Sequence, residues 1–148
     1  MSAWIPVALC MFVIALESTE MLGAQYTSGP LRSIYEAIFG HVTNHRWDLL
    51  HHIIRKTGHF LGYGTIGLCW LRAWRMTIPR LSLFFDATLA LLGTALIASS
   101  DELHQAFLPD RTGMFSDVLL DCSGALVMLS LLVAALVVSR KLRSRGNA

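Results

Sequence analysis

The stretch SSDELHQAFLPDRTGMFSD, Ser99 to Asp117, is the polar centre of an otherwise apolar half of this chain. It holds four carboxylates, a histidine, a glutamine and an arginine. The run LFFDATLALLGTALIA (83–98) precedes it, and VLLDCSGALVMLSLLVAALVV (118–138) follows it. A bilayer core of about 30 Å requires about 20 apolar residues in a helix. The pattern therefore predicts two membrane helices joined by a turn that carries titratable side chains.

The composition of the whole chain also indicates a membrane protein. Of the 148 residues, 54% are hydrophobic and only 15% are charged. A soluble bundle would need polar outer faces on its helices, and the last apolar run offers almost none. We predict an all-α integral membrane bundle of four transmembrane helices in a single domain, 1–148. The predicted spans are residues 3–17, 58–75, 81–103 and 117–139, with a long outer connection at 18–57.

Basic residues predict the orientation of this bundle, because cytoplasmic loops of membrane proteins are enriched in lysine and arginine. Two segments are rich in them, the connection between the second and third spans and the C-terminal tail: Arg72, Arg75, Arg80, Arg140, Lys141, Arg143 and Arg145. Both termini are therefore expected in the cytoplasm, and the segment 100–117 on the opposite side. Because topology explains these basic clusters, we expect no nucleic-acid partner.

The outer connection 18–57 is too long for a structureless loop. Within it, the segment GPLRSIYEAIFG (29–40) is typical of a short amphipathic helix, since Pro30 suits a first helical turn and Gly40 a stop. Such a helix would lie at the membrane surface or cap the bundle. Asn44 is then predicted to cap a helix that continues into the second span.

A polar stripe runs along this second helix. Its members recur at steps of 4, 4, 3 and 4, which places them on one helical face. They are Asp48, His52, Lys56, His59 and Tyr63. Because ionisable groups that face lipid cost several kcal/mol, the stripe is expected to face protein or water. We predict a functional role for the deeper His59 and Tyr63, whereas solvation of the helix end explains His52.

The third and fourth helices carry polar groups at a matching depth. We predict that the third helix continues through Leu108 and that Ser116 caps the fourth. The last turns of the third helix then hold Asp101, Glu102, His104 and Gln105. The fourth helix holds Asp117 in its first turn and Asp121 one turn deeper, while Gly124 on the same face allows close helix packing. Three helices are therefore expected to share one polar pocket just below the outer interface.

The same residues resemble the VanZ-like family of small bacterial membrane proteins. The segments that carry the resemblance are RKTGHFLGYGTIGL (55–68) and SSDELHQAFLPDRTGMFSDVLLDCSGAL (99–126). The family pattern is matched at Lys56, His59, Tyr63, Glu102, Gln105, Arg111, Asp117 and Gly124. Asp121 occupies the place where the family has asparagine, which adds a negative charge when the carboxyl group is ionised.

The resemblance implies a location in the bacterial inner membrane. It also implies a link to low-level resistance to teicoplanin, an acylated glycopeptide that acts at the outer face of that membrane. No established reaction comes with the family. We predict a pocket that recognises an anionic lipid headgroup, a lipid-linked cell-envelope intermediate or a lipoglycopeptide antibiotic. The predicted ligand-binding residues are Lys56, Tyr63, Gln105, Arg111, Asp117 and Asp121.

Whether the protein is an enzyme stays open at this point. In a membrane hydrolase or transferase that acts on a phospholipid or polyprenyl-linked substrate, His59 and Glu102 would be the general acid and base. No nucleophilic serine or cysteine with an obvious base accompanies them in the sequence. A purely structural alternative also stays open, because polar groups at membrane depth seek partners. The pairs would be Glu102–Arg111, Asp117–Lys56 and His59–Asp121.

Metal binding is a further alternative. A set of carboxylates and imidazoles suits a zinc or manganese ion. The candidate ligands in the sequence are His59, Asp101, Glu102 and His104. The HExxH spacing of zinc proteases is missing, so we expect neither a metal ion nor a cofactor.

Overall fold

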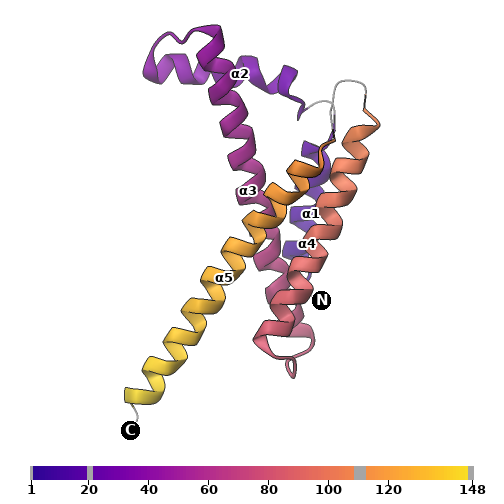
Figure 1. Ribbon diagram of the computed structural model, residues 1–148, viewed down its shortest axis with the longest axis vertical. Coiled ribbons are helices and arrows are strands. Elements are labelled where there is room, and N and C mark those ends of the chain that lie inside the picture. The colour runs from indigo at the N-terminus through magenta and orange to yellow at the C-terminus, as the bar shows by residue number, and fades with distance from the viewer. Residues whose placement is uncertain (1, 20–21, 109–112, 147–148) are drawn as a thin grey trace.

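The computed structural model describes residues 2–19, 22–108 and 113–146 of the chain (Figure 1). Within these ranges the backbone forms five α-helices and no strand: α1 (Ile5–Glu17), α2 (Ala24–Phe39), α3 (Asn44–Thr77), α4 (Leu83–Ala106) and α5 (Phe115–Gly146). The prediction of an all-α protein is thus confirmed.

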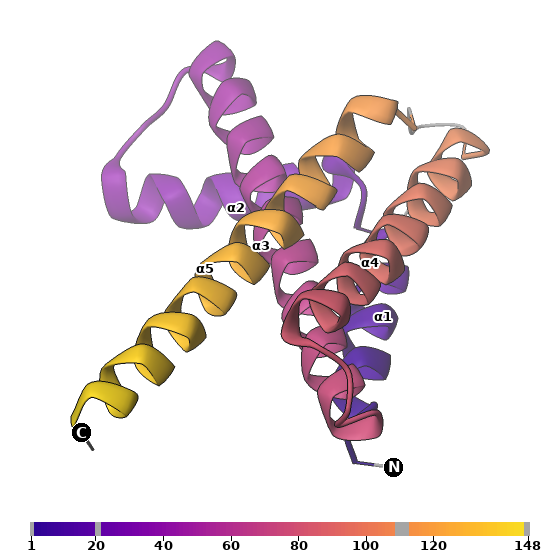
Figure 2. The same ribbon diagram turned by 60° about the horizontal axis from the view of Figure 1, so that its bottom comes forward.

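Helices α1, α3 and α4 lie alongside one another, and α5 crosses α3 (Figures 1 and 2). The beginning of α1, the turn between α3 and α4 and the end of α5 all lie at the lower end of the molecule in Figure 1. The described ends of the α1–α2 and α4–α5 connections lie towards the upper end. Helices α1, α3, α4 and α5 therefore alternate in direction along the molecule. That these helices cross a membrane, and that the lower end faces the cytoplasm, stay predictions.

Two helices are long and apolar enough to cross a membrane, judged by length and composition: α4 and the segment Phe115–Arg143 of α5. They contain most of the predicted spans 81–103 and 117–139. Helix α1 has only 13 residues, which corresponds to about 20 Å of helix, less than the hydrocarbon core of a bilayer. The polar stripe lowers the hydropathy of α3. The four-span bundle is therefore not confirmed, and the spans 3–17 and 58–75 stay predictions.

Helix α3 runs without a break from the outer connection through the second predicted span, as the stripe indicated. The prediction that Asn44 caps it was wrong, because Thr43 is the N-cap residue and Asn44 is already helical. Asn44 Oδ1 instead accepts a hydrogen bond from Arg32, which also donates to Val42 O and Glu36 Oε1. The Val42 backbone N–H and then Arg32 hold the pKa of the Glu36 carboxyl below its usual value.

Helix α2 lies across the N-terminal end of α3 (Figure 2). It begins at Ala24, so the predicted segment 29–40 started too late, and Pro30 lies inside the helix instead of in its first turn. Two side-chain contacts tie α2 to α3. Trp47 Nε1 donates to Ser28 Oγ at 2.7 Å, and His51 Nε2 lies 3.2 Å from Thr27 Oγ1. Helix α2 therefore forms a cap on the N-terminal end of α3.

Small residues set the crossing of α3 and α5. A Cβ atom added to Gly124 would lie 2.1 Å from the carbonyl oxygen of Phe60, so only glycine allows the two backbones to approach this closely. The prediction that Gly124 permits close packing is confirmed. Further contacts along the same seam are Gly64 with Met128, Gly67 with Ala125, and Leu71 in one cluster with Leu129. This seam holds the first turns of α5 against the middle of α3.

Candidate functional site

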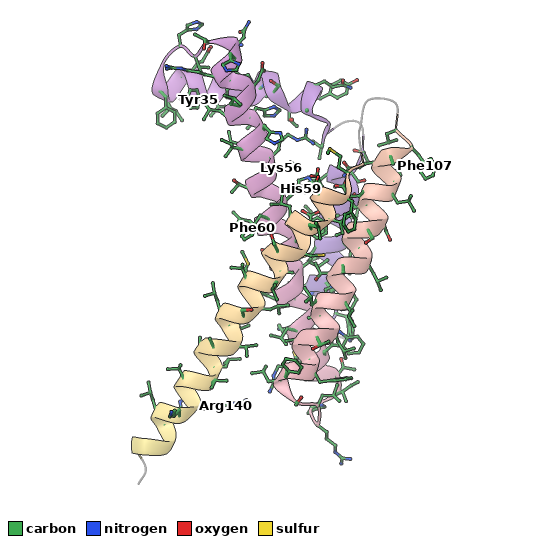
Figure 3. All side chains as sticks on the ribbon, in the orientation of Figure 1. Tyr35, Lys56, His59, Phe60, Phe107 and Arg140 are labelled. Carbon is green, nitrogen blue, oxygen red and sulfur yellow. The ribbon has the colours of Figure 1, made fainter. Side chains whose placement is uncertain are left out.

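Polar side chains from α3, the end of α4 and the beginning of α5 meet at one level of the bundle, above the glycine seam. We call this set the polar cluster: Lys56, His59, Tyr63, Asp101, Glu102, Gln105, Asp117 and Asp121. Figure 3 shows Lys56 and His59 on the part of α3 that lies beside the first turns of α5. The helical steps of 3 and 4 along α3 align its three members, as the sequence predicted.

The outer part of the polar cluster is an ion pair between Lys56 and Asp117. Both side chains are partly exposed, with 31% of Lys56 and 22% of Asp117 accessible. Asp117 lies in the first turn of α5, where the helix dipole favours a carboxylate. The prediction that Ser116 caps this helix was wrong, because α5 begins at Phe115. Its hydroxyl group instead lies 3.3 Å from Asp117 Oδ1.

One turn deeper, His59 and Asp121 face each other with 3.4 Å between Nδ1 and Oδ1. The Asp121 side chain is fully buried, whereas His59 retains 23% exposure. The imidazole ring stacks on Tyr63, with ring centroids 6.1 Å apart. Histidine is thus held between an aromatic ring and a carboxylate, an arrangement that orients its ring nitrogens.

Asp101 joins two other members of the polar cluster. Its Oδ2 accepts hydrogen bonds from Tyr63 Oη at 2.9 Å and from Gln105 Nε2 at 3.1 Å. All three side chains are buried. Asp101 belongs neither to the ligand-binding set predicted from the sequence nor to the residues that match the family pattern. Its signal was the spacing of four residues to Gln105, which places both on one face of α4.

Glu102 accepts a hydrogen bond from the Met114 backbone N–H at 2.8 Å through Oε2. This bond ties the end of α4 to the segment that enters α5. Glu102 Oε1 and both carboxylate oxygens of Asp121 are buried and have no hydrogen-bonding partner among the residues that the structure describes. Glu102, Asp121 and His59 each offer a potential ligand atom, and these three atoms all lie within 4.8 Å of one another.

Two polar residues of the predicted pocket, Arg111 and His104, are not part of the polar cluster. Arg111 lies outside the residues that the structure describes, so its predicted contact with an anionic group stays a prediction. His104 points elsewhere, since its Nδ1 lies 3.1 Å from Ser18 Oγ at the end of α1. The group that could hold a metal therefore differs from the candidate ligands expected from the sequence. It keeps His59 and Glu102 and has Asp121 in place of Asp101 and His104.

Three grooves reach the polar cluster from different sides. One of about 250 Å³ lies between α3 and α5, another of about 180 Å³ lies beneath α2, and a third of about 380 Å³ lies between α1 and α4. The first is lined by Lys56, the second by His59 and Arg55, and the third by Asp101. The polar cluster is therefore accessible from the surface of the bundle.

A larger groove, of about 640 Å³, lies between α4 and α5, away from the polar cluster. Its lining is mostly aliphatic and includes the hydroxyl groups of Thr88 and Ser130, of which Thr88 donates to Phe84 O. A surface of this composition suits acyl chains and offers no charged group for catalysis or for recognition of a headgroup. We therefore place the candidate site at the polar cluster.

A comparison with protein families gives a match to the family described as VanZ/LLP1 over residues 3–137. The match covers most of the chain and includes every member of the polar cluster. Neither the search of curated proteins nor the search of solved structures gave a match.

Proposed function

This chain belongs to the VanZ/LLP1 family, and from that premise we propose that it is an integral membrane protein that recognises an amphiphile with an anionic headgroup. A phospholipid, a polyprenyl-linked cell-envelope intermediate and a lipoglycopeptide antibiotic share this chemistry. The headgroup would bind at the polar cluster, and the acyl or polyprenyl chain would lie along the apolar helices beside it.

One observation carries the proposal: the groove between α3 and α5 is itself amphiphilic. Lys56 and His52 supply its polar lining, and Ile53, Phe60 and Leu120 supply its apolar lining. Lys56 is partly exposed there although it pairs with Asp117. A phosphate or carboxylate on the ligand would accept charge-assisted hydrogen bonds from the ammonium group.

The opposite side of the polar cluster supports a headgroup that also donates hydrogen bonds. Glu102 Oε1 lacks a hydrogen-bonding partner among the described residues, and a buried acceptor in this state costs about 1–3 kcal/mol. Hydroxyl or ammonium groups of a sugar, glycerol or ethanolamine headgroup would satisfy it. Arg55 and His59 line the groove beneath α2 and add cationic or donor character near the same position.

A second function, hydrolysis or group transfer, is favoured by the arrangement of His59 and Asp121. A carboxylate 3.4 Å from an imidazole nitrogen can orient the ring as a general base, with Glu102 as the acid. Among the described residues, the side-chain contacts of His59 are with Asp121 and Tyr63, so water would be the nucleophile. This enzyme would act on the same class of amphiphile.

Mass spectrometry of the purified full chain in nanodiscs tests both functions. The nanodiscs would contain phospholipids and polyprenyl phosphates, and bound molecules and new products would be measured together. We expect retained anionic lipid, and about tenfold less of it in Lys56→Ala, because a hydrogen bond to a charged group contributes about 1.5–3 kcal/mol. Arg80→Ala is the matched control, because this exposed cation lies beyond the far end of α3.

Three results would change the conclusion. Equal lipid retention by Lys56→Ala and Arg80→Ala would remove Lys56 from the binding site. Retention no greater than that of an unrelated membrane protein would contradict lipid recognition altogether. A product that appears with the unaltered protein and disappears in His59→Gln and Glu102→Gln would establish the second function.

A further inference from the structure

Two carboxylates in the interior of the bundle have few partners among the described residues. Asp121 is fully buried and Glu102 is 5% exposed. Glu102 Oε1 and both oxygens of Asp121 accept no hydrogen bond there, and Asp121 Oδ1 has only the 3.4 Å ion-pair contact with His59 Nδ1. Burial of an ionised carboxylate without a partner costs several kcal/mol. A cation between the two side chains would remove this cost.

Within the described residues, the charged members of the polar cluster do not supply that cation. The polar cluster has four carboxylates, whereas its basic members are Lys56 and His59. Lys56 is paired with Asp117, and the described hydrogen bonds of Asp101 come from the neutral donors Tyr63 and Gln105. The deeper carboxylates therefore share one histidine. A divalent ion would balance both of them and leave the imidazole neutral, as a metal ligand must be.

The geometry is close to that of a metal site. One potential ligand atom from each of His59, Glu102 and Asp121 lies within 4.8 Å of the other two. In a tetrahedral zinc site with bonds of about 2.0–2.2 Å, the ligand atoms lie about 3.3–3.6 Å apart. The 3.4 Å between His59 Nδ1 and Asp121 Oδ1 already has this value.

We propose that His59, Glu102 and Asp121 bind one divalent transition-metal ion of the zinc or manganese type. One imidazole with two carboxylates suits these ions, whereas magnesium usually keeps several waters and is held by carboxylates and phosphates. Three protein ligands leave at least one coordination position for water or for a ligand oxygen.

The surroundings of the three ligands resemble the supporting contacts of known metal sites. The Met114 backbone N–H fixes Glu102 through Oε2 and leaves Oε1 without a hydrogen-bonding partner among the described residues. Tyr63 stacks on His59 and restricts the rotation of the imidazole ring. Contacts of this kind orient the ligands and raise metal affinity. The groove beneath α2, which His59 lines, provides an entrance for the ion.

The ion would also explain how a site with excess negative charge recognises an anionic headgroup. Its open coordination position would take a phosphate oxygen that the carboxylates would otherwise repel. This role rests on the proposed function, whereas the metal site itself stands on the geometry of its three ligands.

Metal titration of the full chain in nanodiscs tests the inference. The protein would be treated with a chelator, and Zn²⁺ and Mn²⁺ would be added separately. Bound metal would be measured by mass spectrometry after desalting, and Mn²⁺ also by electron paramagnetic resonance. We expect one ion per chain, a higher melting temperature with metal, and an affinity at least about tenfold lower in Asp121→Asn.

Asp86→Asn is the matched control. Asp86 is also a buried carboxylate on a membrane helix with one unpartnered oxygen among the described residues, but its other oxygen pairs with Arg75 at 3.1 Å. The group of potential metal ligands does not include it. We expect Asp86→Asn to bind the ion as the unaltered protein does.

Two results would overturn the metal site: unaltered protein that retains neither ion, or an Asp121→Asn variant that binds as tightly as the control. The first result requires no variant, so a misfolded Asp121→Asn protein would not protect the inference. Lipid retention would be measured with and without metal in the same preparation. Bound metal without lipid retention would reject the proposed function alone, and lipid retention that persists without any metal binding would reject the metal site alone.

Discussion

The four carboxylates of the polar cluster differ in the partners that stabilise them. Asp117 pairs with a lysine at the surface, Asp101 accepts two neutral hydrogen bonds, Glu102 accepts one from the backbone, and Asp121 faces only His59 among the described ion pairs. Charge compensation therefore weakens from the surface towards the interior. A buried charge with too few partners destabilises the folded state most. Packing therefore explains the burial of Glu102 and Asp121 least well.

At the same scale, His51 makes the cap formed by α2 sensitive to pH. Burial and then Arg55 lower the pKa of His51, while Asp48 acts in the opposite direction. The folded state thus binds fewer protons than the unfolded state between the lowered pKa and about 6.5. The stability that neutral His51 contributes is complete above about pH 6.5 and is lost as the pH falls through its lowered pKa.

Hydrogen exchange of α2 amides should therefore be faster at about pH 5.5 than at about pH 7.5, after correction for the intrinsic exchange rate. His51→Gln should remove most of this difference, because glutamine can replace the contact with Thr27 without titrating. Glu36 does not compete in this range, since its pKa lies below 4.5. A variant with an unchanged pH dependence would show that another group controls the cap.

The candidate site could be predicted from sequence where one helix supplies its residues. Helical spacing aligns Lys56, His59 and Tyr63 on α3, and the structure keeps them together. The pairing between helices could not be derived, because it depends on the rotation of α4. That rotation directs Asp101 towards Tyr63 and His104 towards α1. The alternative metal set from the sequence therefore shares only His59 and Glu102 with the group that the structure brings together.

At the scale of helices, the crossing of α3 and α5 depends on Gly124. Gly124→Ala should destabilise the protein by several kcal/mol or prevent folding. The added Cβ would lie 2.1 Å from a backbone oxygen of α3, and moving either helix backbone to relieve this overlap would disrupt its packing. Thermal unfolding in detergent measures the effect. Gly62→Ala is the control: nothing lies within 4 Å of an added Cβ there, so alanine should be neutral or stabilising by about 0.5–1 kcal/mol.

Helix types were easier to predict than helix ends. The continuous α3 and the long apolar α4 and α5 follow from periodicity and hydropathy. The beginning of α2 was missed because Pro30, a residue typical of a first turn, lies in the helix interior. Capping residues were also displaced by one position in α3. Local side-chain contacts, such as Arg32 with Asn44, decide these positions and are not encoded by spacing.

For the whole molecule, the arrangement places the α2 cap and the turn between α3 and α4 at opposite ends (Figure 1). The basic residues of that turn predict that it faces the cytoplasm. An ion pair between Arg75 and Asp86 links the two helices there, and Trp4, Trp70 and Trp74 pack together nearby. Tryptophan at this depth is typical of a membrane interface.

Cysteine labelling in intact bacterial cells tests this orientation. With the native cysteines replaced by serine, Ser33→Cys on α2 should react with a membrane-impermeant thiol reagent, because Ser33 is exposed and α2 is predicted to lie on the outer side of the membrane. Arg80→Cys, also exposed, should react only after the cells are permeabilised. The opposite pattern would invert the topology, and labelling of both sites in intact cells would contradict a spanning bundle.

The close contact at Gly124 also has a mechanical meaning. Beyond its crossing with α3, α5 diverges from α4 towards its C-terminal end (Figures 1 and 2). About 33 Å of α5 extends past Gly124, at 1.5 Å per residue. A tilt of about 10° at the crossing would displace the far end of α5 by about 6 Å. The polar cluster lies close to the crossing, on the other side of it from the basic tail. A small change in the angle between α3 and α5 at the polar cluster therefore produces a larger displacement of the basic tail.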